Sequence, residues 1–186
     1  PELISNTGDP IRLWHLQDSK YRIPKAFFGI FFRSEKLHSS PLNLNLISLY
    51  IKLYMDHVNQ LYFSGRLVSC SYSLVANKFG LELSVYGFND KLDAYALSLV
   101  KELVNYRIDP ARYEILRDCQ QNLLKLFATW AIRNQLNFFL DLLISSNSWS
   151  YDELQASYGE VTSEAVQALL LDILSHWDVE LFTYGN

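Results

Sequence analysis

The sequence predicts an α+β fold in which a mainly antiparallel sheet packs against helices. Apolar residues alternate with polar ones in short paired segments, as in strands that form hairpins, and recur at three- and four-residue steps in longer separate blocks, as in helices. The composition supports a folded core, because 49% of the 186 residues are apolar and only 7 are glycine and 5 proline. These values exclude collagen-like, proline-rich and flexible-linker classes.

The first thirty residues predict two strands joined by a turn. Residues 1–10 are expected to be an extended lead-in to a single domain over residues 11–186. Residues 11–16 are short and apolar, which predicts a strand or a sheet edge, and residues 18–22 are polar and typical of a turn. The continuous apolar run 26–32 predicts a buried strand, because it is rich in aromatics and too short for a typical helix.

A long helix and a hairpin are expected next. Ser40-Pro41 predicts a helix start, since a hydroxyl cap is followed by proline at the first helical position. The apolar stripe continues to about Phe63. Residues 69–76 and 81–86 then alternate with a period of two, and the connection 77–80 has hairpin chemistry.

The remaining segments predict mostly helices. Asn89-Asp90 is expected to cap one helix and Asp109-Pro110 to start another. We expect this second helix to bury one apolar side, formed by Leu116, Cys119, Leu123 and Phe127. Four further elements follow in order: a helix over 136–144, a short helix opened by the capping box Ser150-x-x-Glu153, a helix starting at Thr162, and a final strand over 179–184.

The charge distribution is asymmetric along the chain. No Lys or Arg follows Arg133, so the last 53 residues carry −8 and the first 133 carry +4. We interpret the acids as solvated helix faces, with steering of a partner as the alternative. The cluster Lys20, Arg22 and Lys25 is interpreted as a solvated turn rather than a polyanion site. The absence of a dense basic block predicts no nucleic-acid partner, and the absence of about 18 consecutive apolar residues predicts no membrane span.

Only two cysteines are present, Cys70 and Cys119. They are too few for a disulfide framework or a cysteine zinc site, and we expect both to be buried thiols in a reducing compartment, which predicts a cytoplasmic protein. The sequence starts at Pro1 without an initiator methionine and shows no signal peptide. We therefore expect it to be a segment of a longer polypeptide.

The motifs of common catalytic and metal sites are missing, so we expect no catalytic, cofactor-binding or metal-binding residue in this segment. Neither His-Glu-x-x-His nor His-x-x-Glu-His is present. Asp56 precedes His57, but adjacent helical residues point about 100° apart and do not easily share an ion. The carboxylate pairs Asp90/Asp93 and Asp152/Glu153 are expected at helix N-termini. The four histidines are scattered: His15, His38, His57 and His176.

Several short segments, taken in register, carry a resemblance that no single motif provides. They are Leu13-Trp14-x-x-Gln17-Asp18-x-Lys20-Tyr21-x-Ile23-Pro24-Lys25-Ala26, Leu49-Tyr50-x-x-Leu53-x-x-Asp56-x-x-Asn59, Gly80-x-x-Leu83-Ser84-Val85-x-Gly87-Phe88-Asn89-Asp90-Lys91, Ile108-Asp109-x-x-Arg112-Tyr113-Glu114-Ile115, Trp149-x-x-Asp152-Glu153-Leu154 and Gly185-Asn186. In this order they resemble the insulinase family of zinc metallopeptidases, in its middle (third) domain.

The resemblance implies a fold, a function and partners. Members of this family have four related α+β domains in two bowl-like halves that enclose a chamber for peptide hydrolysis. The His-x-x-Glu-His zinc motif lies in the first domain, so this segment is expected to be a non-catalytic part of the C-terminal half, with zinc elsewhere in the parent. The implied partners are the other domains of the same polypeptide and peptide substrates.

Two other interpretations remain open. The segment could be a non-enzymatic interaction or assembly domain with the same fold, including a catalytically dead homologue. It could also be a self-sufficient hydrolase of another class that uses Cys119 or His57.

Overall fold

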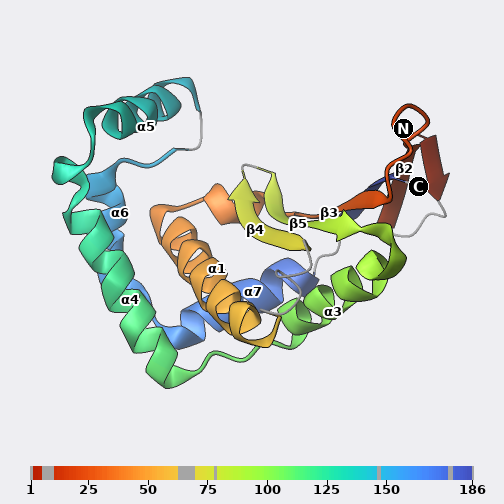
Figure 1. Ribbon diagram of the computed structural model, residues 1–186. Helices are drawn as coiled ribbons and strands as arrows, with labels where there is room; N and C mark the ends of the chain where they lie inside the picture. Colours follow the sequence, from red (N-terminus) through yellow and green to blue (C-terminus); the bar gives the residue numbers. More distant parts are fainter. Residues whose placement is uncertain are drawn as a thin grey trace.

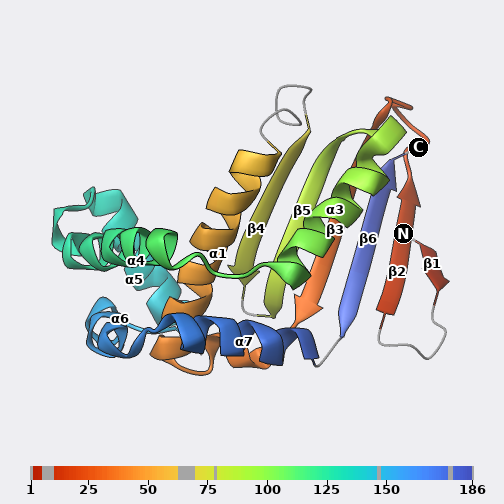
Figure 2. The same ribbon diagram turned by 90° about the horizontal axis from the view of Figure 1, so that it is seen from below.

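The computed structural model describes residues 2–5, 11–62, 70–77, 79–145, 148–175 and 178–185. Within this part of the chain, the strands form a six-stranded sheet in the order β1-β2-β6-β3-β5-β4 (Figure 2). The bounds of the strands are Glu2–Ser5 for β1, Ile11–Gln17 for β2, Lys25–Arg33 for β3, Ser71–Asn77 for β4, Gly80–Phe88 for β5 and Val179–Gly185 for β6.

The sheet is mainly antiparallel, as the sequence predicts. Strand β6, the last element described, lies between β2 and β3, where it pairs in parallel with β2 and antiparallel with β3. The other three neighbouring pairs, β1–β2, β3–β5 and β4–β5, are antiparallel. Insertion of β6 therefore joins the two ends of the sequence in one sheet, and both ends lie at the same side of the molecule (Figure 1).

The helices form a layer on one face of the sheet (Figures 1 and 2). Helices α1, α3 and α7 lie against this face, while α4, α5 and α6 extend beyond it at the end away from the two termini. Their bounds are Pro41–Leu61 for α1, Leu92–Asn105 for α3, Pro110–Lys125 for α4, Ile132–Ile144 for α5, Tyr151–Ser157 for α6 and Ser163–Ser175 for α7.

Three of the predicted helix starts are confirmed by their capping bonds. The Ser40 hydroxyl accepts a hydrogen bond from the Asn43 N–H at 3.1 Å, and Asp109 accepts one from Ala111 at 3.0 Å. Ser150 and Glu153 form the reciprocal capping box. The predicted end of the first helix needs correction, because α1 ends at Leu61; residues 63–69 lie outside the described part.

The capping role predicted for Asn89-Asp90 is wrong. These residues form a 3₁₀ turn with Lys91, and α3 begins at Leu92 without a side-chain capping bond. The reason is that β5 runs directly into this turn, where the Asn89 N–H is tied to the Pro24 carbonyl at 3.3 Å.

The buried side of α4 also differs from the prediction. Tyr113 and Gln120 are buried, with Leu116 and Leu124 packed against the core, whereas Cys119 and Leu123 are exposed. The face is turned by one position because Tyr113 and Gln120 find buried carbonyl partners on Val161 and Asn45, at 2.9 and 3.3 Å. The next helix, α5, begins at Ile132, four residues before its predicted start.

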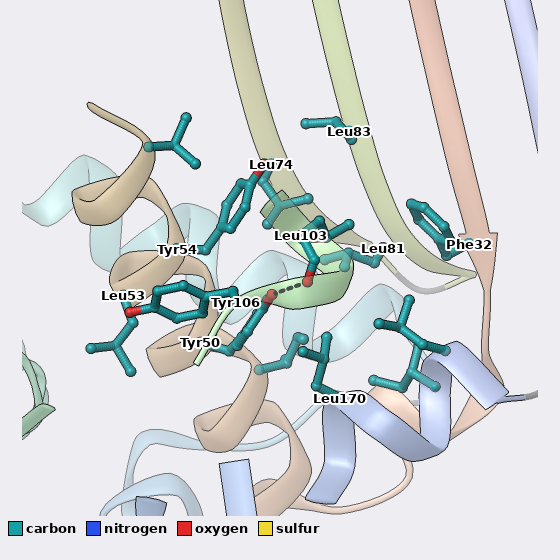
Figure 3. Packing of buried hydrophobic residues seen from close by; sticks show 14 of the residues in the cluster. Phe32, Tyr50, Leu53, Tyr54, Leu74, Leu81, Leu83, Leu103, Tyr106 and Leu170 are labelled. Atoms are coloured by element: carbon teal, nitrogen blue, oxygen red, sulfur yellow. Dashed lines mark hydrogen bonds between the residues drawn. The ribbon is translucent and has the colours of Figure 1, made fainter. Parts of the chain in front are cut away.

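The core lies between the sheet and α1, α3 and α7 and contains an unusual pair of tyrosines (Figure 3). Tyr50 and Tyr54 of α1 are almost fully buried, and their hydroxyls donate to the carbonyls of Leu103 and Leu99 in α3, at 3.0 and 2.8 Å. Burial raises the pKa of both phenols. These bonds tie α1 to α3 within the apolar core.

Candidate functional site

The face of the sheet opposite the helices is not covered by any described element. We call it the open sheet face. The register places on it every second residue of each strand, from Arg12 to Leu16 in β2, from Lys25 to Arg33 in β3 and from Glu82 to Phe88 in β5. In an antiparallel sheet with one solvated face, these positions are usually polar. Here they carry seven aromatic side chains: Trp14, Phe27, Phe31, Tyr86, Phe88, Phe182 and Tyr184.

These aromatics are only partly shielded by one another. Phe27 of β3 and Phe182 of β6 are neighbours with ring centroids 6.3 Å apart, whereas Tyr86 and Phe88 of β5 remain 40% and 47% exposed. Gly29 lies in the middle of β3, and a Cβ atom there would come within 3.1 Å of the rings of Phe27 and Phe31. The absence of a side chain at Gly29 therefore leaves room for the rings of Phe27 and Phe31 over the middle of β3.

A chain of ion pairs braces the open sheet face across three strands. The Arg12 guanidinium of β2 contacts Glu180 of β6 at 3.3 Å and Asp178 at 2.8 Å, and Arg33 of β3 contacts the other oxygen of Glu180 at 2.8 Å. The hydrogen bond to Asp178 raises the pKa of Arg12. One carboxylate thus links two strands that do not pair directly, which stiffens the face at this end.

A hollow lies beside this ion-pair chain. It has a volume of about 330 Å³ and is lined by Phe31 and Arg33 of β3, Asn77 and Phe79 at the β4–β5 turn, and Glu180. Phe79 is 78% exposed, although the backbone beside it is fixed: its carbonyl accepts the Ser34 N–H at 3.0 Å. Aromatic walls with a few charged groups at the rim suit an apolar side chain of a peptide segment.

The charge asymmetry of the sequence is offset in the fold at three of the eight acids that follow Arg133. Asp178 and Glu180 pair with Arg12 and Arg33, and Asp172 pairs with Lys36 at 2.6 Å. The insertion of β6 between β2 and β3 brings the acidic end of the chain against the basic beginning. Five of the eight acids have no ion pair with another described residue, and they are Asp141, Asp152, Glu153, Glu160 and Glu164.

The turn after β2 is more than the polar loop that the sequence suggests. Asp18 is only 3% exposed, and its carboxylate accepts the N–H groups of Lys20 at 3.2 Å, Tyr21 at 2.9 Å and Ile23 at 3.4 Å. The bond from Tyr21 is the main cause that lowers the pKa of Asp18. The turn is therefore rigid, and it positions Lys25, whose ammonium lies 5.4 Å from the ring centre of Tyr86 on the open sheet face.

The residues weighed as catalytic candidates lie on different elements. His15 of β2 contacts the Thr183 hydroxyl at 2.7 Å, and His57 of α1 contacts Glu102 of α3 at 3.1 Å. The carbonyl of His38 accepts the indole N–H of Trp149 at 3.3 Å. His176 lies outside the described residues.

The expectation of two buried thiols is wrong. Cys70 is partly buried beside Gly87, and Cys119 is exposed because the buried side of α4 is turned away from it. In the described part of the chain, no group of three or more His, Cys, Asp or Glu side chains could hold a metal ion. The donor set that a catalytic zinc needs is thus not assembled by these residues.

None of the described helices is both long enough and apolar enough to cross a bilayer.

Comparisons with known proteins point to one family. Residues 1–157 match the family model described as the middle or third domain of peptidase M16. Insulin-degrading enzyme of Bos taurus is 30% identical over 186 residues, which cover 100% of this chain and 18% of that protein. Insulin-degrading enzyme-like 1, peroxisomal, of Arabidopsis thaliana is 23% identical over 178 residues, which cover 94% of this chain and 18% of that protein.

Solved structures show the same fold. The crystal structure of pitrilysin matches with a TM-score of 0.89 at 21% identity, over 100% of this chain and 20% of that chain. The chain thus spans about a fifth of the length of these relatives and of pitrilysin.

Proposed function

Because the chain belongs to the peptidase M16 (insulinase) family, as its middle or third domain, we propose that it forms part of the wall of a peptide-enclosing chamber in a zinc metalloendopeptidase. In this proposal the domain is non-catalytic, and the open sheet face is the inner side of the wall. Zinc and the groups that act on the peptide bond lie on another domain of the parent. The parent's partners are peptide substrates and its own other domains.

The character of the open sheet face is the observation that supports this proposal. A sheet face that looked out to solvent would be polar at most positions, whereas this one carries seven aromatics and a hollow of about 330 Å³. A face of this kind offers many weak, sequence-tolerant contacts to an unfolded peptide. Binding energy from such remote contacts orients a scissile bond held elsewhere.

The rigidity of the face fits the same role. The carboxylate of Glu180 holds Arg12 and Arg33, and Asp18 fixes the turn that carries Lys25. A wall that limits the size and the path of a substrate must keep its shape, so bracing of this kind is useful there. Asp172, Asp178 and Glu180 are paired with basic residues, which reduces the charge that the acidic end contributes to long-range steering.

Peptide-length dependence in the full-length parent tests the proposal. We would substitute Phe31→Ala and Phe79→Ala in the hollow, and compare a long unstructured peptide with a short one that spans only the scissile bond and its neighbours. The expected result is a several-fold rise in KM for the long peptide, unchanged kcat, and unchanged kinetics for the short peptide.

Leu97→Ala is the matched control, because Leu97 is 55% exposed on α3, on the helical side of the domain. It should leave both peptides unaffected. Equal losses of kcat with both peptides would mean that the hollow takes part in the chemistry, and unchanged KM in every variant would contradict the wall proposal.

The protein is proposed to reside in a reducing compartment. One relative is named peroxisomal, so the family is not confined to the cytoplasm that the thiols suggest. Free, unpaired cysteines at positions 70 and 119 are consistent with any reducing compartment.

A further inference from the structure

Helix α5 shows an apolar surface that the described residues leave largely exposed. All 13 residues of Ile132–Ile144 are at least partly exposed. We call α5 outer face the side formed by Ile132, Leu136, Phe139, Leu140 and Leu143, whose exposed fractions run from 47% to 83%. At about 100° per residue these five side chains fall within a sector of about 100°, so they form one continuous stripe.

The helix meets the rest of the domain through a small aromatic cluster and a side-chain hydrogen bond. Phe138 packs against Tyr151, with ring centres 4.4 Å apart, and Phe127 stacks on the same tyrosine at 3.7 Å. The side-chain amide of Gln135 donates to the carbonyl of Trp130 at 2.9 Å. These contacts use Gln135, Phe138 and Phe139, so most of the α5 outer face stays exposed.

The helix is amphipathic, because Asn134, Asn137 and Asp141 lie on the side opposite the stripe. One side of α5 is satisfied within this domain, and the other is a stripe of large aliphatic and aromatic side chains of the kind that marks an interaction site. Arg133 and Asp141 are the only charged residues of the helix, and both lie beyond the stripe or at its rim.

The proteins that match this chain indicate what covers the stripe. The match spans 18% of bovine insulin-degrading enzyme and is described as a middle or third domain, so most of such a polypeptide lies outside residues 1–186. Helix α5 projects beyond the sheet at the end away from the two termini (Figure 1). The stripe is thus available to a neighbouring domain without obstruction by the chain connections.

We propose that the α5 outer face docks against another domain of the same polypeptide and is buried there in the full-length protein. The contact would be apolar, with Leu136 near its centre, Leu143 at its C-terminal end and Arg133 at its rim. This inference needs the family assignment but not the chamber role, because a domain interface forms whether or not the open sheet face meets peptides.

Site-specific photo-cross-linking in the full-length protein tests the proposal. The photoreactive residue p-benzoylphenylalanine would replace Leu143, and in the control it would replace Asp141, an exposed residue on the same helix but outside the stripe. The expected result at position 143 is an intramolecular cross-link, which keeps the monomer mass on a denaturing gel and maps by mass spectrometry to a segment outside residues 1–186. The control should give little or none.

Two results would overturn the proposal. A cross-link at position 143 that doubles the mass would assign the stripe to a second copy of the protein, and equal, low yields at both positions would show that it remains exposed. A second measurement guards against misfolding of the variants. Ile132→Cys should be alkylated by N-ethylmaleimide several-fold more slowly than Asp141→Cys in the folded full-length protein and equally fast in urea, and equal rates in the folded protein would also count against docking.

Discussion

The carboxylate of Asp56 in α1 is held by the guanidinium of Arg112 in α4 through two hydrogen bonds, from Nε at 2.9 Å and from Nη2 at 2.6 Å. These bonds raise the pKa of Arg112. Both residues belong to the segments on which the family resemblance rests. The neighbouring His57 points elsewhere and contacts Glu102. Polar residues of the family pattern thus hold helices together in this domain.

The Asp56–Arg112 pair should contribute measurably to stability because it is bidentate, although it is partly exposed. A double-mutant cycle with Asp56→Ala and Arg112→Ala should give a favourable coupling energy that is larger at low salt than at high salt, measured by urea unfolding. Arg112→Lys should lose most of this coupling, since lysine cannot form the two parallel bonds. A coupling energy near zero would show that the pair is too well solvated to join the helices.

The two buried tyrosines should differ in the cost of losing their hydroxyls. The Leu103 carbonyl lies in the last turn of α3, where helix carbonyls lack an intrahelical donor, so Tyr50→Phe leaves it unsatisfied (Figure 3). The Leu99 carbonyl lies one turn earlier, and Tyr54→Phe removes only a second bond to it. We expect unfolding free energies to fall by about 2 kcal/mol for Tyr50→Phe and about 1 kcal/mol or less for Tyr54→Phe. Equal costs would contradict this difference.

Gly80, which begins β5 after the β4–β5 turn, should not tolerate a side chain. Its φ is +145°, and a Cβ atom there would lie 1.9 Å from the Phe32 carbonyl oxygen. Gly80→Ala should therefore cost several kcal/mol, on the order of 3 or more, and disturb the pairing of β3 with β5. Gly159→Ala is the control, because a Cβ atom there meets nothing within 4 Å, and thermal unfolding should show almost no change. A mild effect at position 80 would mean that the turn adapts.

Acid should weaken the fold through Asp18 and Glu153. The backbone N–H groups of Tyr21, Ile23 and Lys20 lower the pKa of Asp18 from its ordinary 3.8. The Ser150 hydroxyl and N–H lower the pKa of Glu153 from 4.5. Since both pKa values are lower in the folded state, the stabilisation is present above these ordinary values and is lost as the pH falls through the folded ones. The stability gap between wild type and Asp18→Asn should be largest near neutral pH and shrink below about pH 4. Urea unfolding at several pH values measures it, and a gap that stays constant or widens in acid would refute the assignment.

Glu153→Gln should show the same pH trend with a smaller gap at neutral pH, because glutamine can keep the capping box. This variant separates the effect of charge from the loss of the hydrogen bond itself.

Local sequence signals predicted most of the elements. Serine, aspartate and proline mark helix starts through bonds within one turn, so Ser40, Asp109 and Ser150 are found where their spacing places them. The prediction for Asn89-Asp90 is wrong because a long-range bond to Pro24 decides the geometry there. The exposed Cys119 has a similar cause, since the rotation of α4 depends on partners at distant positions such as Val161.

The open sheet face was not predictable from periodicity alone. Alternation in β3 is hidden because both sides of the strand are apolar, so the run 26–32 reads as buried throughout. Likewise, the ion pairs of Glu180 with Arg12 and Arg33 require the position of β6 in the sheet, which no local pattern encodes. These contacts become visible only when the strand order is known.

Hydroxyl-radical footprinting of the full-length protein, with and without a bound long unstructured peptide, tests most directly whether the open sheet face is the inner side of a chamber wall. Tyr86 and Phe88 lie on this face, and Leu97 and Leu171 are similarly exposed on the helical side. We predict that the peptide slows oxidation of Tyr86 and Phe88 and leaves Leu97 and Leu171 unchanged. Protection of the helical side instead, or no protection of Tyr86 and Phe88 at saturating peptide, would contradict the proposed orientation and role of this domain.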